Sequence, residues 1–313
     1  MKTARAILAG LVFAGNAVAQ TYPAKPIRFI VGPGPDALAR VIGQQLTQAW
    51  AQPVIIDQRG GGGGTISAEA VAKAAPDGYT LLLATGTHTI NPSMYKVTYD
   101  MVRDFAPVTL LASTPFILAV HPSVPASSVA ELIKLAKSKP GTLNYGSGGS
   151  GTPPHLGTEL FKAMAGIDMV HVPYKTVAAA ITDLVAGQLQ VMFTVGPAGL
   201  PQIRAGRIRG LAVSTAKRSA FAPELPTVAE SGLPGFDVFG WNGLLAPAGT
   251  PGSVIAKLHG EIVKALGDRE VRERIAGFGF EPVGDSPEEF GEFIKSDIAR
   301  WAKVAKESGA RVD

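Results

Sequence analysis

Cysteine is absent from this chain of 313 residues. Its absence excludes a disulfide framework, a cysteine nucleophile and a lipid carried by a cysteine behind a leader peptide. A chain of this length can bury a sizeable core without covalent cross-links. Aromatic residues amount to only 7%, and the net charge of +4 arises from scattered basic residues rather than a continuous stripe. We therefore expect no nucleic-acid partner.

Long apolar segments are also missing, apart from one at the N-terminus. There Lys2 and Arg5 precede the apolar stretch 6–14, and the segment 17–19 (Ala-Val-Ala) has the small-x-small pattern of a cleavage site. This layout is typical of a secretory signal peptide, and we expect cleavage after Ala19. The stretch is too short for a permanent membrane anchor. Since no cysteine can carry a lipid, we expect the mature protein to be free in the periplasm.

The rest of the chain alternates short apolar runs with amphipathic segments, which predicts an α/β fold. The first part indicates strands at 27–31, 54–57 and 81–84, with helices at 36–50 and 66–74. Two apolar runs at 108–112 and 116–120 then follow without a helix between them, as in segments that cross between domains. A second α/β series occupies residues 128–214. The segment 236–245 has the pattern of a return crossing, and a capping box at 286–289 predicts a terminal helix to about residue 308.

Two crossings mean that a second lobe is inserted into the first. We expect a first lobe from residues 20–120 and 232–313, and a second lobe from residues 121–231. The crossing segments are predicted near 112–122 and 229–245. A ligand is expected in the cleft between the lobes, at the carboxyl ends of the strands.

Glycine- and hydroxyl-rich loops lie between strands and helix N-termini in both lobes, at 32–36, 60–65, 85–88 and 146–152. Backbone N–H groups and the positive end of the helix dipole favour anions at such places. One such loop is ordinary turn chemistry, whereas four on the same side of two lobes favour a binding site. The last loop is the strongest candidate, because Ser147, Ser150 and Thr152 add hydroxyl groups and His155 lies one helical turn further on.

Sequence motifs typical of catalytic or cofactor sites are weak in this chain. Gly32, Gly34 and Ala37, with Asp57 at the end of the next strand, approach a dinucleotide-binding fingerprint. The prolines on both sides of Gly34 remove N–H donors that a pyrophosphate needs, so an exported dinucleotide-binding enzyme is the weaker alternative. No P-loop, Gly-x-Ser-x-Gly elbow, metal-ligand spacing of histidines or prominent pair of carboxylates occurs. We expect a binding protein without cofactor or metal, and not an enzyme.

An ordered series of motifs covers essentially the whole mature chain. It comprises Tyr22-Pro-x-Lys-Pro-Ile-Arg28, Gln52-Pro-Val-Ile-Ile-Asp-Gln-Arg59, Ala75-Pro-Asp-Gly-Tyr-Thr-Leu-Leu82, Asn144-Tyr-Gly-Ser-Gly-Gly-Ser-Gly-Thr152, His171-Val-Pro-Tyr-Lys175 and Gly240-Trp-Asn-Gly. The series resembles the substrate-binding proteins of tripartite tricarboxylate transporters, the Bug-type receptors. This resemblance implies a monomer with the two-lobed, Venus-flytrap fold of type II periplasmic binding proteins. It also implies capture of a di- or tricarboxylate or an aromatic acid for the transporter's membrane subunits. A sensory receptor that feeds a two-component kinase is the alternative.

By position, the resemblance implies a ligand site shared by both lobes. Its candidate members are Gly32, Gly34, Asp36, Thr85, Thr87, Asn91, Ser147, Gly148, Gly149, Ser150, Thr152, His155, Tyr174, Lys175 and Thr194. In such receptors, backbone groups and ordered waters of the loops at 32–36 and 147–152 hold one carboxylate.

Three features of the sequence depart from the family pattern. The loop at 32–36 is about three residues shorter than usual, which puts one wall of the site in doubt. Thr176 and Val177 replace small glycine-rich residues, and Thr194 stands where an acid is frequent. The missing acid favours a plain carboxylic acid over a ligand with an amino group.

Overall fold

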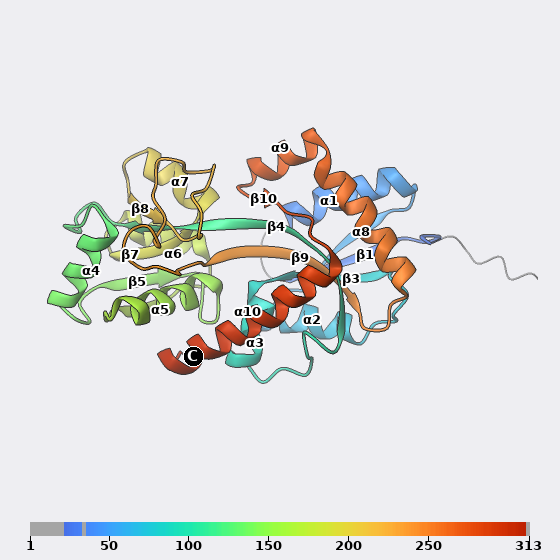
Figure 1. Ribbon diagram of the computed structural model, residues 1–313, viewed down its shortest axis with the longest axis horizontal. Coiled ribbons are helices and arrows are strands. Elements are labelled where there is room, and N and C mark those ends of the chain that lie inside the picture. Colours follow the sequence, from blue (N-terminus) through green and yellow to red (C-terminus); the bar gives the residue numbers. More distant parts are fainter. Residues whose placement is uncertain (1–21, 33–35, 311–313) are drawn as a thin grey trace, which may run out of the picture.

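A computed structural model describes residues 22–32 and 36–310 of the chain. The predicted signal peptide, residues 1–19, and the candidate site residue Gly34 lie outside the described residues. Figure 1 shows two α/β bodies joined by two long strands. We call the body that holds the N-terminal strands the first lobe and the other the second lobe.

Three parallel strands form the centre of the first lobe. The strands are β1 (Ile27–Val31), β2 (Val54–Gln58) and β3 (Thr80–Thr85), and the helices that follow them are α1 (Ala37–Trp50), α2 (Thr65–Ala72) and α3 (Gly86–Met94). β1 lies between its neighbours, so that Phe29 is opposite Ile56 on one side and Leu81 on the other. The predicted β-α-β-α-β order is confirmed. Parallel strands connected by helices are covered on both faces, which is why β1 and β3 are so apolar, whereas β2 lies at the sheet edge and is only partly buried.

The second lobe repeats this design. Its strands are β5 (Asn144–Ser147), β6 (Val170–Pro173), β7 (Val191–Val195) and β8 (Arg209–Val213), and its helices are α4 (Val129–Ser138), α5 (Pro153–Ala165), α6 (Val177–Val185) and α7 (Gly196–Arg204). β5 pairs in parallel with β6 and β7. Helix α7 was not predicted, because its nine residues include two glycines and two prolines.

Two strands run between the lobes, β4 (Phe105–Val120) and β9 (Phe239–Pro247). β4 pairs with β9 along residues 105–115 and continues into the second lobe, where residues 116–120 pair with β7. The two apolar runs expected at 108–112 and 116–120 are therefore parts of one strand of 16 residues. The intervening Ser113, Thr114 and Pro115 suggested a break, but pairing with β9 keeps them extended. β9 supplies the predicted return crossing.

The C-terminal elements are α8 (Gly252–Gly267), α9 (Arg269–Gly277), β10 (Glu281–Pro282) and α10 (Pro287–Ser308). α9 was not predicted, because only Val271 and Ile275 are buried along it. The capping box that opens α10 is confirmed, since Glu289 N donates to Ser286 Oγ at 3.2 Å and Ser286 N donates to the Glu289 carboxylate at 2.9 Å.

Helix α10 belongs to both cores. Phe290 and Ile294, near its start, are buried with first-lobe residues, whereas Trp301 and Val304, near its end, are buried in the main core of the second lobe. Figure 1 shows the helix running from β10 toward α5, with its C-terminal end beside the second lobe. The helix is therefore a third connection between the lobes, beside β4 and β9.

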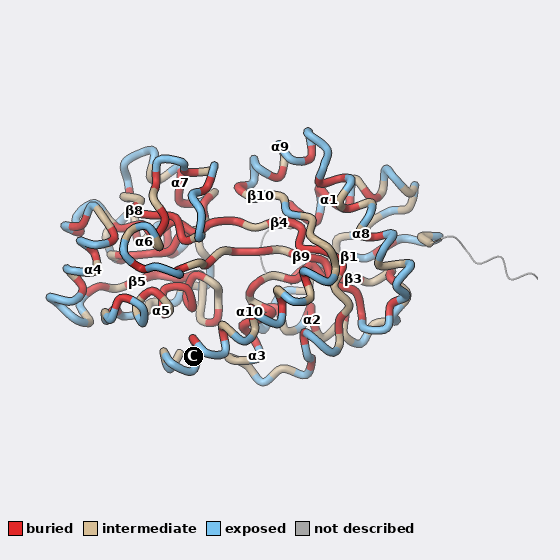
Figure 2. Tube along the Cα trace, in the orientation of Figure 1, coloured by how far each residue is buried: buried red, intermediate tan, exposed pale blue. Residues whose placement is uncertain are grey.

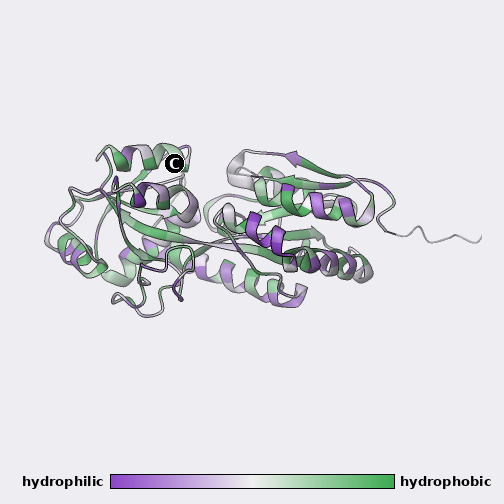
Figure 3. Ribbon diagram, turned by 90° about the horizontal axis from the view of Figure 1, so that it is seen from above, coloured by the Kyte–Doolittle hydropathy of each residue, from purple (hydrophilic) through white to green (hydrophobic). Residues whose placement is uncertain are grey.

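Burial follows the strands through both lobes. In Figure 2 most residues of β4, β9, β1 and β3 are buried. Figure 3 shows hydrophobic strands enclosed by helices with hydrophilic residues on their outer faces. No helix of the described part of the chain is long and apolar enough to cross a membrane.

Gly243 of β9 has no room for a side chain. A Cβ atom there would lie 2.1 Å from Cζ of Phe290, which is fully buried. We expect Gly243→Ala to lower the free energy of unfolding by about 1–3 kcal/mol, the usual cost of overpacking a core. Urea unfolding measures this change. Gly260→Ala is the matched control, because no atom lies within 4 Å of its added Cβ. That exposed helical position should gain about 0.5–1 kcal/mol. Equal effects at both positions would contradict the packing described.

Candidate ligand-binding site

Three loops of the first lobe meet at the carboxyl ends of its parallel strands. Gly32, directly after β1, lies at their junction: a Cβ atom there would be 3.0 Å from Ser67 Oγ, 3.6 Å from Gly64 Cα and 3.7 Å from His88 Cε1. Ser67 and Gly64 belong to the connection after β2, and His88 to the one after β3. The strand ends of a parallel sheet commonly form ligand sites in this way.

Glycine shapes the connection after β2. Residues 61–64 all have positive φ angles, from 54° to 109°, a conformation that glycine adopts at no steric cost. Three of them form a 3₁₀ turn, η1 (Gly62–Gly64), from which α2 begins. The hydroxyl of Ser67 donates to the carbonyl of Gly64 at 2.7 Å and fixes the end of the turn. The backbone of this loop therefore reaches the site without side chains to shield it.

His88 ties the loops together. Thr85 N donates to Nδ1 of His88 at 3.0 Å, and Nε2 lies 3.4 Å from Ser67 Oγ. Burial lowers the pKa of this imidazole to about 4, against opposing hydrogen bonds with Thr85 and Gly64. The pair of Thr85 and His88 caps α3, so this helix starts at Gly86, within the segment expected to be a loop. The sequence predicted a loop at His88, within the segment 85–91 that was expected to line the cleft, but did not single out this histidine.

The main loop of the second lobe, residues 147–152, is braced by its own hydroxyls. Ser147 Oγ donates to the carbonyl of Gly149 at 3.1 Å and accepts from Gly149 N at 3.2 Å. Thr152 Oγ1 donates to the same carbonyl at 2.7 Å. Ser150 is half-buried, and its hydroxyl makes no hydrogen bond within the described part of the chain. Ser147 and Thr152 therefore shape the loop, while Ser150 and the backbone are the groups left to meet a ligand.

Two stacked imidazole rings pack beside this loop and support it. The rings of His155 and His171 lie 4.0 Å apart with an interplanar angle of 15°, and Tyr145 stacks on His171 at 4.8 Å. Nδ1 of His155 accepts from Gly151 N at 3.1 Å. Burial, with the nearby charge of Lys162, lowers the pKa of His155 to about 4. His155 was predicted as a ligand contact, and in the structure it is 3% exposed and holds the loop backbone.

Within the candidate loop, Ser147 and His171 have the spacing of a nucleophile and its base. Ser147 Oγ and His171 Nε2 are 2.7 Å apart, within the range of such catalytic pairs. The serine is fully buried, however, and the same hydroxyl is engaged with Gly149. A substrate cannot approach this oxygen in the folded loop, so the pair is structural.

We expect Ser147→Ala to lower the free energy of unfolding by about 1–2 kcal/mol, because the part-buried Gly149 N–H loses its acceptor and the bonds of the fully buried hydroxyl to Gly149 and His171 are lost. Chemical denaturation of the purified protein measures the loss. Ser150→Ala should change the free energy of unfolding by less than about 0.5 kcal/mol, since that hydroxyl stabilises nothing nearby. A loss as large at Ser150 as at Ser147 would contradict the bracing role.

The other predicted site residues of the second lobe differ in their exposure to solvent and in their partners. The hydroxyl of Tyr174 donates to the Asp183 carboxylate at 2.6 Å, and burial together with this carboxylate raises the pKa of Tyr174 to about 12. Lys175 is exposed before α6 and forms no ion pair with a described residue. Thr194 is fully buried beneath α7, where a Cβ on Gly199 would lie 2.2 Å from its Cγ2. Of the three, Lys175 is exposed, Tyr174 is half-buried and Thr194 is shut off from solvent.

Asp36, Thr87 and Asn91 complete the first-lobe candidates. Asp36 accepts from Arg40 at 2.6 Å, and this hydrogen bond holds the pKa of its carboxyl below the usual range. Thr87 is half-buried in the first turn of α3. Asn91 is fully buried, and its Nδ2 donates to the carbonyl of Gly63 at 3.0 Å. Its Oδ1 has no hydrogen-bond partner among the described residues.

The candidate loops of the two lobes face each other. A Cβ on Gly86 of the first lobe would lie 3.0 Å from Pro153 of the second. A Cβ on Gly151 of the second lobe would lie 3.5 Å from Tyr95 and 3.6 Å from Met94, both from the end of α3. The loops predicted at 85–88 and 146–152 thus lie on the two sides of one junction, through Gly86 and Gly151. Tyr95 was not among the predicted residues, since nothing in its local sequence marks it.

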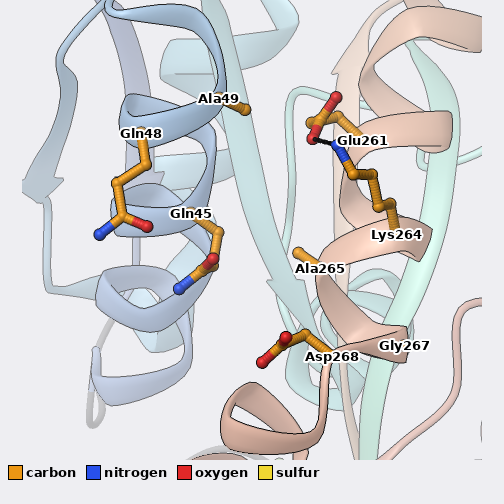
Figure 4. Close-up of a pocket in the computed structure, with 8 residues that line it drawn as sticks. All are labelled: Gln45, Gln48, Ala49, Glu261, Lys264, Ala265, Gly267 and Asp268. Atoms are coloured by element: carbon orange, nitrogen blue, oxygen red, sulfur yellow. Dashed lines mark hydrogen bonds and ion pairs between the residues drawn. The ribbon is translucent and has the colours of Figure 1, made fainter.

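A groove of the described surface lies elsewhere, between α1 and α8 (Figure 4). It has a volume of about 500 Å³ and is lined by Gln45, Gln48, Ala49, Glu261, Lys264, Ala265, Gly267 and Asp268. None of the predicted site residues belongs to this lining. The groove is open, unlike the enclosed sites that hold small ligands, so we do not assign it the ligand.

Comparison with known proteins identifies the family. The model of the "Tripartite tricarboxylate transporter family receptor" matches residues 38–310. The chain belongs to this family. The receptor is 36% identical to the protein BugT of Bordetella pertussis, over 94% of this chain and 92% of that one. It is 37% identical to a protein encoded in the tcbD–tcbE intergenic region of Pseudomonas sp. strain P51, over 97% and 94% of the two chains.

Solved structures agree. Rpa4515 of R. palustris, solved with adipate, has a TM-score of 0.83 to the receptor, with 38% identity over 93% of this chain and 100% of that one. MatC of Rhodopseudomonas palustris, with bound malate, has a TM-score of 0.78, with 30% identity over 90% and 99% of the two chains. The predicted family and the two-lobed α/β fold are confirmed. Membership of a receptor family also argues against the alternative of a dinucleotide-binding enzyme.

Proposed function

We propose that the receptor captures a small dicarboxylate between its two lobes. The supporting observation is the junction at which the glycine-rich loops of both lobes face each other, through the contacts of Gly86 with Pro153 and of Gly151 with Tyr95. Helix α5 begins at this junction with Pro153, and a helix N-terminus favours an anion. Two anion-binding walls suit a ligand with two carboxylates, as in the relatives solved with adipate and malate.

The receptor acts by binding and not by catalysis. The serine that pairs with His171 in the candidate loop, Ser147, is fully buried, which supports binding rather than catalysis. Thr194, which stands where an acid is frequent in the family, gives no partner to a ligand amino group. Plain di- or tricarboxylic acids and aromatic acids therefore fit better than amino acids.

The residues of the ligand site and the lobe boundaries are part of this proposal. Gly32, Ser150, Thr85, Thr87 and Lys175 supply the groups nearest to the ligand, and Ser147, Thr152 and His155 hold the loop that meets it. The first lobe comprises residues 20–120 and 232–313 and the second lobe residues 121–231, with the last turns of α10 packed on the second lobe. The leader at 1–19 directs export, and the mature protein, a monomer in the periplasm, delivers its ligand to the membrane subunits of a tripartite transporter.

A thermal-shift screen tests the proposal. Purified mature protein, from residue 20, is heated with mono-, di- and tricarboxylates, acidic amino acids and NADH as separate additives. A ligand at about 100 times its dissociation constant adds about 2.7 kcal/mol to the free energy of unfolding. In a chain of this size the melting temperature then rises by roughly 5–10 °C. A shift with NADH and none with any carboxylate would overturn the proposal.

A further inference from the structure

Tyr95 occupies the place where the two lobes touch. It directly follows α3 in the first lobe and is half-buried. A Cβ atom on Gly63, in the glycine run of the same lobe, would lie 3.3 Å from its hydroxyl oxygen and 3.4 Å from its ring. A Cβ atom on Gly151, in the glycine loop of the second lobe, would lie 3.5 Å from the ring. One aromatic ring therefore packs against the glycine loops of both lobes.

Both loops are glycine at the point of contact. Gly63 has a φ angle of +61° and Gly151 one of +76°, and neither has a side chain to separate its backbone from the ring. An aromatic ring laid on bare backbone buries apolar surface with little loss of side-chain entropy, because tyrosine has only two side-chain torsions. The contact is thus suited to repeated opening and closing.

The backbone of Tyr95 is fixed to the first lobe. Tyr95 N donates to the carbonyl of Asn91 at 2.8 Å, and Nδ2 of Asn91 donates to the carbonyl of Gly63 at 3.0 Å. Gly151 is fixed to the second lobe, because its N–H donates to His155 at 3.1 Å. Separation of the lobes must therefore break the contact of Tyr95 with Gly151 and leave that with Gly63 intact.

We propose that Tyr95 is an interlobe clasp: its ring docks on Gly151 in the closed receptor and limits the rate at which the lobes open and release the ligand. The inference rests on the proposed capture of a dicarboxylate between the lobes. Tyr95 is a positioning residue, since it acts through the glycine loops and its hydroxyl lies nearest to Gly63. Removing the ring should favour the open form and speed release.

The first test measures lobe opening without any ligand. Because the chain has no cysteine, Lys73→Cys at the end of α2 and Lys137→Cys in α4 place one label on each lobe without background. Both positions are exposed and distant in sequence from the clasp. Energy transfer between the labels reports the interlobe distance. Tyr95→Ala should lengthen the mean distance, whereas Tyr95→Phe, which keeps the ring, should retain the wild-type distance.

The second test measures release of adipate and malate by stopped flow on the same labelled proteins. Tyr95→Ala should raise the dissociation rate constant about tenfold, which corresponds to about 1.4 kcal/mol. Tyr95→Phe should stay within about twofold of the wild type. Unchanged distances and rates in Tyr95→Ala would overturn the clasp, and so would a phenylalanine variant that behaves like alanine. If the wild type binds no carboxylate, the proposed function fails instead, and the distance measurement still decides whether the clasp exists.

Discussion

Replacing Asp297 with alanine should lower the free energy of unfolding by about 3 kcal/mol or more. The carboxylate is fully buried and accepts hydrogen bonds from Thr89 Oγ1 at 2.7 Å and Trp241 Nε1 at 3.1 Å. It also pairs with the guanidinium of Arg300, whose second nitrogen donates to the carbonyl of Asp237 at 2.8 Å. Alanine would leave the buried Trp241 Nε1 without an acceptor and the guanidinium of Arg300 without its carboxylate, whereas Thr89 Oγ1 keeps the carbonyl of Gly86 at 2.8 Å. Guanidinium unfolding at pH 7 measures the loss.

The loss at Asp297 matters because of its position. The cluster joins α3 of the first lobe, the connecting strand β9 and the bridging helix α10. Asp297→Asn is the matched variant: it keeps an oxygen acceptor but removes the charge opposite Arg300, so it should fall between wild type and alanine. Thr89→Val removes one donor together with its need for a partner and should cost about 1 kcal/mol. A loss below about 1 kcal/mol in Asp297→Ala would contradict the role of this cluster.

Stability should fall by roughly 4 kcal/mol between pH 7 and pH 5, through two buried histidines. In the folded receptor the pKa values of His88 and His155 are lowered to about 4, and burial is the main cause for both. In the unfolded chain each imidazole titrates near its model value of 6.5. As the pH falls from 6.5 toward 4, the unfolded chain binds protons that the folded protein does not. Each histidine therefore costs about 2 kcal/mol at pH 5, and stability is fully present only above pH 6.5.

Melting curves from pH 7.5 to pH 5 test this, with a combined fall of roughly 10 °C expected. His88→Asn and His155→Asn are suitable variants, because the asparagine oxygen can accept the backbone N–H that Nδ1 now accepts. Each variant should remove about half of the pH dependence, and the double variant nearly all of it. A wild-type slope that persists in the double variant would assign the effect to other groups.

The fold was largely predictable because its signals are local. Each central strand is a short apolar run, such as Leu81–Ala84, and each glycine-rich loop stands between such a run and a helix start. The positive φ angles of residues 61–64 explain why this stretch is glycine, and their place after a strand could be anticipated. Polar residues in the middle of β4 concealed its continuity, since pairing with β9 cannot be seen in the chain's own pattern.

The supporting residues of the site were not predictable in the same way. Asp297 bonds with Thr89 across 208 positions of the chain, and Ser147 with His171 across 24. The position of His155 in the sequence predicted a ligand contact, yet in the structure its ring accepts a hydrogen bond from the backbone of the loop. Tyr95 gave no signal, because its neighbours Gly63 and Gly151 come together only when the lobes meet. Sequence pattern located the loops, whereas tertiary contacts decide which side chains hold them.

Isothermal titration calorimetry of the mature receptor with adipate and with adipamide tests the central claim most directly. The two compounds have the same chain length and differ only in their charged ends. If the loops of both lobes bind carboxylates, a dicarboxylate such as adipate or malate binds with one-to-one stoichiometry, and the diamide gives no heat of binding. Equal binding of acid and diamide, or no binding of any mono-, di- or tricarboxylate, would contradict the account.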